Sequence, residues 1–235
     1  MIKSLPQLDT PKKIRIKFSK TGELIYISHL DLVRTMTRAI IRARIPVKYT
    51  EGYNPIPKLI FATPLSVGCA SECEYLDLKI DRDMSVLDIK ENLGRSMPEG
   101  IKIVDVYEPQ SKFTDAVYSS YDIVINDGKI DESSYRAVAD EFEKTELVIM
   151  KRSKSGEKEV DILPYVKSFE CTSSDGEIKI NTMLCVSSAD YLNPEYIVSV
   201  AFRVLGLSKE NYNVDSGYTI LRRNLYLSDQ KTEFK

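Results

Sequence analysis

The most constraining feature of the sequence is a strictly alternating stretch that passes directly into helical periodicity. In residues 13–18, KIRIKF, three apolar side chains alternate with three basic ones. This period of two predicts a half-buried strand whose open face is entirely basic. In the segment that follows, Ser28 with Asp31 three residues later is typical of a helix N-cap with an acidic first turn, and Pro46 ends the helix. The first 46 residues therefore predict a strand followed by an amphipathic helix.

Weaker patterns extend this order along the chain. Further strands are expected around residues 59–61, 74–80 and 102–107, with a helix over residues 85–96. The second half repeats the order, with strands over residues 117–126, 147–152, 158–163, 178–186 and 218–227 and helices over residues 132–144 and 193–207. Strand, helix, strand, strand, helix, strand is the ferredoxin-like pattern. The sequence therefore predicts an α+β protein of two tandem ferredoxin-like (βαββαβ) domains, residues 1–112 and 113–235, with loose polar ends at residues 1–11 and 228–235.

The charges are unevenly distributed. The chain of 235 residues has a formal net charge of −2, but residues 1–50 carry 11 Lys and Arg against 3 Asp and Glu. The first 50 residues are thus at +8 and the remainder at −10. Such asymmetry points to a surface that faces a polyanion.

The basic residues are the first candidates for function, as contacts to the phosphate backbone of RNA. Arginine forks suit phosphate oxygens, although arginines opposite an apolar helix face can equally be a solvated surface. A second cluster, in the segment KRSK, could instead pair with acidic residues across a hairpin. The predicted nucleic-acid contacts are Arg15, Lys17, Lys20, Arg34, Arg38, Arg42, Lys151 and Arg152.

A proline-rich loop over residues 51–65 offers three more candidates, Tyr53, Asn54 and Lys58. Tyr53 could stack on an unpaired base, or it could fill the space between two sheets.

The single histidine, His29, begins the predicted helix. It could act as general acid or base in metal-independent RNA cleavage, with Tyr26, Tyr49 or Tyr53 and Lys58 as partners. Alternatively, the Ser-His-Leu-Asp turn only caps the helix.

Several classes of protein find no support. No apolar run is long enough for a signal peptide or a membrane helix, which predicts a soluble cytoplasmic protein. Cys69 and Cys73 do not have the usual zinc spacing, so all four cysteines are expected to be buried or incidental thiols. Motifs for nucleotide hydrolysis are absent from the sequence, and no metal or cofactor is expected.

One long run of residues resembles a known family. The shared elements are Phe18-Ser19-Lys20-x-Gly22, Ile27-Ser28-His29-Leu30-Asp31-Leu32, Arg34, Arg38-Ala39, Pro46, Gly52-Tyr53-Asn54-Pro55, Pro57-Lys58, Phe61-Ala62, Pro64-Leu65, Gly68 and Glu74, with a second motif in KRSKSGEKEVDILPYV. They resemble the signature of the radical SAM-linked proteins, a bacterial family of unknown function. Its members stand alone or follow a cobalamin-binding-like region and a radical SAM domain. Because this chain lacks the cysteines that bind the iron–sulfur cluster, the resemblance implies a stand-alone partner of a radical SAM enzyme.

Three functions follow as expectations. The first is a non-catalytic RNA-binding or substrate-presenting partner of a radical SAM enzyme. The second is a metal-independent endoribonuclease that uses His29, an alternative that a fold-level analogy to CRISPR RNA-processing endoribonucleases keeps open. The third is a protein-interaction adaptor that binds no nucleic acid.

Overall fold

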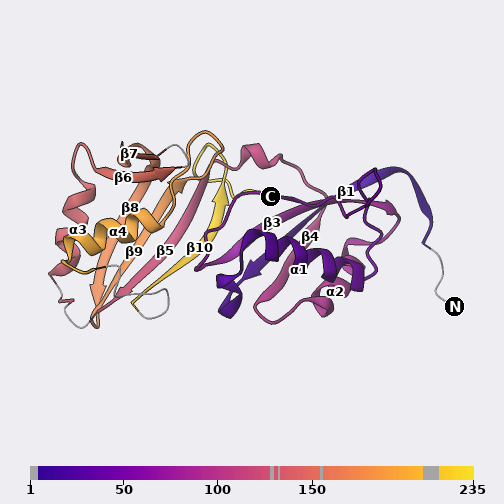
Figure 1. Cartoon of the computed structure of the whole chain (residues 1–235), viewed down its shortest axis with the longest axis horizontal. Helices are drawn as coiled ribbons and strands as arrows, with labels where there is room; N and C mark the ends of the chain where they lie inside the picture. Colours follow the sequence, from indigo (N-terminus) through magenta and orange to yellow (C-terminus); the bar gives the residue numbers. More distant parts are fainter. Residues whose placement is uncertain (1–4, 128–129, 132, 154–155, 209–216) are drawn as a thin grey trace. The chain divides into compact units, whose positions relative to one another are not determined.

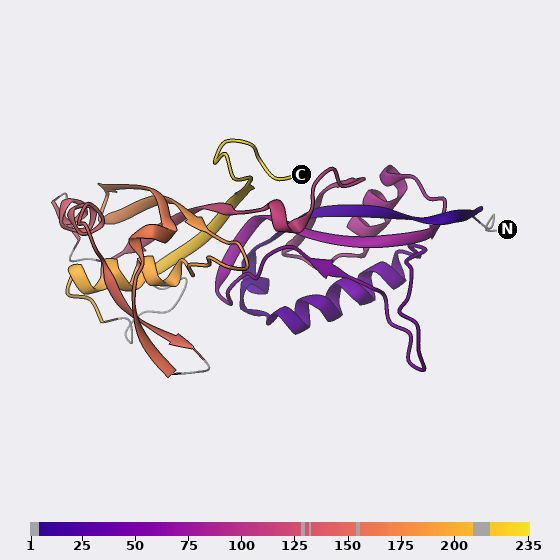
Figure 2. The ribbon, with the colours of Figure 1, turned by 90° about the horizontal axis from the view of Figure 1, so that it is seen from above.

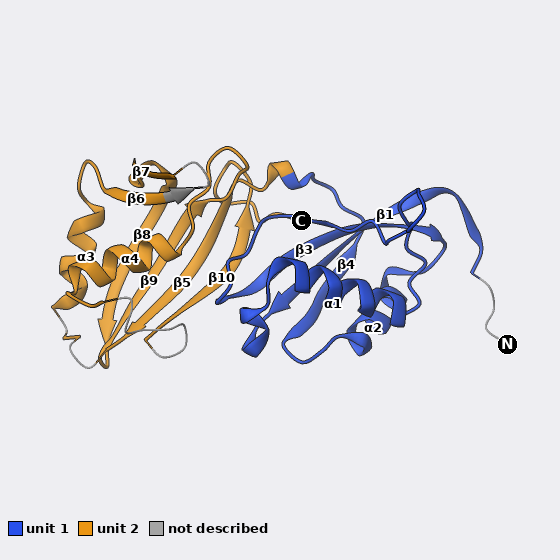
Figure 3. Cartoon of the chain, in the orientation of Figure 1, with its two compact units in different colours: residues 1–113, 235 blue, residues 114–234 orange. Residues whose placement is uncertain are grey.

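The computed structural model describes residues 5–127, 130–131, 133–153, 156–208 and 217–235. In these residues the protein is a mixed α+β structure with four α-helices and antiparallel strands, which confirms the predicted α+β class. The chain divides into two compact units (Figure 3). Unit 1 comprises residues 1–113 and 235, and unit 2 comprises residues 114–234.

Unit 1 contains two helices and a sheet (Figure 1). Its elements are β1 (Gln7–Lys20), the 3-10 helix η1 (Gly22–Tyr26), α1 (His29–Arg42), β2 (Ile60–Phe61), β3 (Cys69–Arg82), α2 (Val86–Ser96) and β4 (Ile101–Tyr107). The strands lie in the order β4-β1-β3, with β2 paired to the outer side of β3. The described pairings are antiparallel.

The start of α1 confirms the N-cap prediction. The Ser28 Oγ accepts a hydrogen bond from the backbone N–H of Asp31 at 3.2 Å and donates one to the Asp31 carboxylate at 2.7 Å. These bonds satisfy a backbone donor that the first helical turn leaves without an intrahelical partner. The hydrogen bonds to Ser28 and the Arg34 guanidinium together hold the pKa of Asp31 below its usual value.

The two faces of the unit 1 sheet differ. On one face, side chains of β1, β3 and β4 pack against α1 and α2 to form the core of the unit. Members of this core include Ile14, Ile16 and Phe18, as the alternation predicts. Because neighbouring side chains in a strand point to opposite faces, Lys13, Arg15 and Lys17 point to the face away from the helices.

Unit 2 holds a second four-stranded sheet. Its elements are β5 (Tyr118–Asn126), α3 (Ser134–Phe142), β6 (Val148–Ser153), β7 (Gly156–Asp161), the 3-10 helix η3 (Leu163–Tyr165), β8 (Val166–Ser174), β9 (Glu177–Cys185), α4 (Glu195–Val204) and β10 (Tyr218–Tyr226), and a further 3-10 helix, η2 (Phe113–Asp115), precedes β5. The strands lie in the order β10-β5-β9-β8. Strands β6 and β7 form a separate two-stranded hairpin, which projects from the unit in Figure 2.

Three expectations about elements are wrong. Strand β1 begins at Gln7, so the residues before 12 are not all loose. The sequence pattern does not predict β8, and the strands predicted over residues 147–152 and 158–163 form the separate hairpin instead. The end of the chain is not loose either, since Phe234 is fully buried and its N–H donates to the carbonyl of Leu225 at 2.8 Å. The other part of the predicted loose start, residues 1–4, lies outside the described residues.

No helix in the part of the chain that the structure describes combines the length and apolar character needed to cross a membrane.

Candidate phosphate-binding cleft

The basic face predicted for residues 13–18 is not open. Arg15 is 0% exposed, and its guanidinium donates to both carboxylate oxygens of Asp77, which is 2% exposed, at 2.7 and 2.9 Å. It also donates to the hydroxyl and the carbonyl of Ser111, and to the carbonyl of Lys235, each at 3.0 Å. The ring of Phe113 lies 4.4 Å from its central carbon. Arg15 is therefore a structural ion-pair residue, and the expectation that it faces a phosphate backbone is wrong.

Two further lysines of β1 are also covered. Lys20 is buried, and its Nζ donates to the carbonyl of Ile25 at 3.3 Å. Lys17 is half-buried, with its Nζ 5.7 Å from the centre of the Tyr75 ring. Alternation in the sequence shows which side chains of β1 share a face. It does not show what other parts of the chain cover the basic face, so the prediction of an open basic face fails here.

The three arginines of α1 lie on the exposed side of that helix. Arg34 pairs with Asp31 at 3.2 Å, Arg42 donates to the carbonyl of Ser96 at 2.7 Å, and Arg38 is exposed. Because α1 packs on the sheet through its apolar side, these arginines lie on the opposite side of the sheet from Arg15 and Lys17. The structure thus does not bring the predicted strand and helix residues together into one groove.

A different group of lysines does come together. A cleft of about 390 Å³ opens on unit 1, lined by Lys13, Lys48, Lys58, Lys79, Asp77, Ile60 and Leu78. Clefts for small ligands have volumes of about 300–1,000 Å³, so this one is large enough for a nucleotide. Of these lysines, Lys58 is among the contacts predicted from the sequence, and Lys13 belongs to the basic strand face predicted there.

Strand pairing positions the four lysines. Lys13 of β1 lies directly opposite Lys79 of β3. The N–H of Lys48 donates to the carbonyl of Lys79 at 2.7 Å, and the N–H of Lys58 donates to the carbonyl of Lys48 at 3.1 Å. The four side chains therefore come from four stretches of the chain that backbone hydrogen bonds hold side by side.

The cleft carries an excess of positive charge. The Lys13 Nζ lies 2.8 Å from Asp77, whose carboxylate already accepts the bidentate pair from Arg15. Within the residues that the structure describes, Lys48, Lys58 and Lys79 form no salt bridge. Like charges directly opposite one another across two strands are destabilising, so the pair of Lys13 and Lys79 favours an anion between them. A cleft lined by one sign of charge also concentrates its electric field on a ligand.

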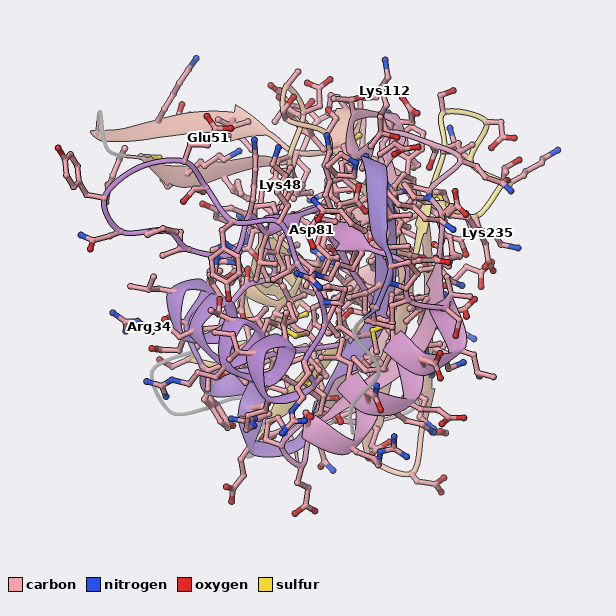
Figure 4. All side chains as sticks on the ribbon, turned by 90° about the vertical axis from the view of Figure 1, so that its right-hand side faces the viewer. Arg34, Lys48, Glu51, Asp81, Lys112 and Lys235 are labelled. Atoms are coloured by element: carbon pink, nitrogen blue, oxygen red, sulfur yellow. The ribbon has the colours of Figure 1, made fainter. Side chains whose placement is uncertain are left out.

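A hairpin-like loop rises from the rim of the cleft. Tyr49 and Pro57 form a β-bridge, and the N–H of Thr50 donates to the carbonyl of Ile56 at 2.8 Å. At the tip, Asn54 is exposed and Tyr53 is fully exposed, so Tyr53 does not fill a gap in the core. Figure 4 shows Lys48 with the loop that carries Glu51, while Arg34 projects from α1 away from them.

His29 lies on the other face of the sheet from the cleft. Its ring contacts Phe61 edge-on, with 5.2 Å between ring centres. Phe61 pairs with Leu76, a core residue, whereas Ile60 pairs with Asp77 in the cleft. His29 is exposed, but the described contacts do not join it to the partners predicted from the sequence, Tyr26, Tyr49, Tyr53 and Lys58. Its catalytic role stays a prediction.

The basic residues of the hairpin in unit 2 are described only in part. The Nζ of Lys151 donates to the carbonyl of Tyr191 at 3.1 Å and lies 5.9 Å from the centre of the Tyr165 ring. Arg152 belongs to β6, but its side chain lies outside the description, as does all of Lys154. A phosphate contact at this hairpin stays a prediction.

The four cysteines are free thiols. Cys69, Cys73 and Cys185 are buried, as expected, and Cys171 is half-buried. Desolvation raises the pKa of the Cys171 thiol to about 11. Thiols whose pKa is raised by burial are poor nucleophiles at neutral pH.

Lys48 and Lys79 are site residues that the sequence does not predict. Lys79 belongs to the alternating strand EYLDLKI, and Lys48 lies two residues after Pro46, the proline predicted to end the first helix. Neither carries a signal by itself. Only the pairing of β1 with β3 brings Lys79 opposite Lys13.

Comparison with known proteins gives a family but no assigned activity. A family model, DUF2344, described as an uncharacterized protein conserved in bacteria, matches residues 13–194. No curated protein matches the sequence. Among solved structures, the crystal structure of an unknown protein from Galdieria sulphuraria is similar, with 10% identity, coverage of 90% of this chain and 96% of that chain, and a TM-score of 0.26.

Proposed function

The chain belongs to the bacterial family DUF2344, and within that family we propose that it is a non-catalytic RNA-binding or substrate-presenting protein whose phosphate site is the lysine cleft of unit 1. The observation that carries this proposal is the like-charge pair of Lys13 and Lys79, with Lys48 and Lys58 beside it. Such a cluster repels itself in the free protein, and a phosphate group relieves that repulsion.

The cleft suits a phosphate better than a metal ion or an uncharged substrate. Its charged lining is four ammonium groups and one carboxylate, and that carboxylate is held by Arg15 and Lys13. Lysine ammonium groups are compact point charges with three donors, which bind phosphate oxygens without a fixed geometry. The cleft can therefore hold a backbone phosphate without reading the sequence of the RNA.

The strand orders support the finer fold proposal of two ferredoxin-like units. Numbered within each unit, with β5, β8, β9 and β10 as the four strands of unit 2, both sheets run fourth-first-third-second. That is the order of the split βαβ arrangement, with the β6–β7 hairpin as an insertion. In such a unit both helices pack on one face of the sheet, and the cleft lies on the other face, beside the covered Arg15.

The proposed partner is a radical SAM enzyme, and the support for it is the sequence resemblance. In this proposal the chain presents bound RNA to the enzyme, which performs the chemistry. Retention of a radical SAM enzyme on the tagged chain, from an extract of the source bacterium treated with nuclease, is the expected result. Retention of that enzyme without any RNA binding by the purified chain would favour the adaptor function instead.

RNA affinity measured at two salt concentrations tests the phosphate site. Each lysine that contacts a phosphate contributes roughly 0.7–0.9 to the slope of log affinity against log salt. We therefore expect Lys48→Ala and Lys79→Ala each to lower that slope by this amount, across RNA sequences alike. Lys102→Ala is the matched control, because Lys102 is exposed on β4, at the opposite edge of the sheet from β2.

Absence of RNA affinity, or an affinity that does not change with salt, would overturn the proposal. The arginines of α1 are a second proposed contact, for an RNA long enough to reach the other side of unit 1. Arg38→Ala is then expected to lower the affinity for a long RNA and to leave the affinity for a short oligonucleotide unchanged.

The endoribonuclease alternative rests on the exposure of His29 at the first position of α1. Incubation of RNA with the protein in EDTA tests it. Cleavage that disappears in His29→Ala supports this function, and cleavage that persists in the variant or never occurs excludes His29 as the catalytic group.

A further inference from the structure

The loop beside the cleft exposes an unusual number of apolar side chains. Within residues 49–60 the side chains of Tyr49, Tyr53, Ile56 and Ile60 are 43%, 106%, 61% and 48% exposed. A single exposed apolar residue is ordinary on a protein surface. Four of them next to a group of lysines form the combination by which proteins bind unpaired nucleotides, since bases stack on aromatic rings while cations follow the backbone.

We propose that the RNA bound at the cleft is single-stranded, with a phosphate held by the lysines and unpaired bases placed on Tyr53 and the neighbouring apolar side chains of the loop. This inference rests on the proposed function and adds the class of RNA. A duplex buries its bases in the helical stack and offers phosphates and 2′-hydroxyls to a protein. A duplex would therefore contact the lysines of the cleft, but it would offer no base to stack on the exposed tyrosine rings.

The base of the loop is already shaped in the free protein. The Lys58 N–H donates to the Lys48 carbonyl, Tyr49 is bridged to Pro57, and the N–H of Ile56 also donates to the hydroxyl of Thr50 at 3.1 Å. At the tip, Gly52 has φ +138°, a conformation that glycine adopts without strain. A loop held at its base loses less conformational entropy on binding than an unstructured one.

The floor of the cleft agrees with this ligand. Ile60 lines it beside the lysines, whereas the Leu78 side chain is buried in the core on the helix side of the sheet. The exposed apolar side chain of Ile60 can contact a ribose or a base, which an isolated phosphate group does not offer. Ile60 lies only two residues beyond Lys58. The exposed side chains of the loop therefore continue along the chain into residues that line the cleft.

Fluorescence anisotropy with the full chain tests the inference. The first probe is a labelled single-stranded oligouridylate of about ten nucleotides, in the range of known single-strand sites. The second is a paired RNA hairpin of equal charge whose stem is closed by a non-nucleotide linker, so that it has no unpaired base. Inorganic polyphosphate is the competitor. We expect the single strand to bind more tightly than the paired hairpin. Tyr53→Ala is expected to lower the affinity for the single strand roughly 5- to 100-fold, because one or more bases lose the ring on which they stack.

Matched variants separate stacking from charge. Tyr53→Phe keeps the ring and is expected to bind as the wild-type chain does. Tyr53→Ala is expected to leave the affinity for polyphosphate and for the paired hairpin unchanged. Lys48→Ala is expected to lower the affinity for all three ligands. Because Tyr53 is fully exposed, its replacement is expected to leave the melting temperature unchanged.

The outcomes are distinguishable. Equal affinity for the single strand and the paired hairpin, with no effect of Tyr53→Ala, overturns the single-strand inference and leaves the phosphate site intact. If none of the three polyanions binds, the proposed function itself fails. A loop that instead binds an acidic peptide, with no competition by oligouridylate, would identify the surface as a protein-binding site and overturn the inference as well.

Discussion

Replacement of Arg15 by methionine tests whether the buried ion pair holds unit 1 together. Arg15 and Asp77 are almost fully excluded from water, and Arg15 donates to both oxygens of the Asp77 carboxylate. Methionine fills a similar volume but donates no hydrogen bond. It therefore leaves the Asp77 carboxylate buried with one described cation, Lys13, at 2.8 Å.

The expected loss in the free energy of unfolding depends on the remaining ion pair between Lys13 and Asp77. Breaking a buried ion pair by removing one partner costs about 3–5 kcal/mol, because a buried charge is left uncompensated. Lys13 is half-exposed and offsets part of this cost, so the loss is expected near the lower end, about 3 kcal/mol. In the double variant Arg15→Met/Asp77→Leu no charge is left buried, and most of the lost stability is expected to return.

Hydrogen–deuterium exchange of the full chain measures this effect in unit 1 alone, which a single melting curve of a two-unit protein does not. A loss of about 3 kcal/mol raises the exchange rates of globally protected amides in β1 and β3 roughly 100-fold. Arg34→Met is the control, since Arg34 forms an exposed pair with Asp31 and such pairs contribute about 1 kcal/mol or less. Unchanged exchange in Arg15→Met, or a double variant less stable than the single one, would refute the reasoning.

Three further predictions concern other parts of the chain. Phe234→Ala is expected to lower the stability of unit 2 by about 3–5 kcal/mol, the usual cost of a buried phenylalanine, whereas a loose terminus would give no change in thermal unfolding. Hydrogen bonds from Thr232 and from the Lys231 backbone lower the pKa of Asp229 to about 2, so its contribution to stability is present above about pH 4 and lost as the pH falls toward 2. An NMR titration of the Asp229 carboxyl checks this, and a midpoint near 4 would contradict it. With its pKa raised to about 11, the Cys171 thiol is expected to react slowly with iodoacetamide at pH 7 and faster only as the pH approaches that value; fast labelling at pH 7 would contradict the burial.

The sequence predicts much of the core, because periodicity reports which side chains are apolar and how they are spaced. Ile14, Ile16 and Phe18 are buried as the alternation requires. The same alternation predicts Arg15 in solvent, which is wrong. Its partners Asp77 and Ser111 lie far away in the chain, so no local pattern indicates that they bury it.

Elements with weak patterns were missed for a related reason. Strand β8 is rich in polar residues and has no buried side chain, so little in its sequence distinguishes it from a loop. It is a strand because β9 offers its edge for pairing. The lysine cleft has the same origin, since it depends on strand register, which a single sequence leaves open.

The hydrogen bond between Lys58 and Lys48 joins the two ends of the loop next to the sheet. Because residues 51–56 beyond this point are all exposed, a change in the length or composition of that tip is expected to leave β1 and β3 undisturbed. Under the proposed function, a tip of different sequence would change which bases the protein prefers, while the lysines at the base of the loop would still bind the phosphate.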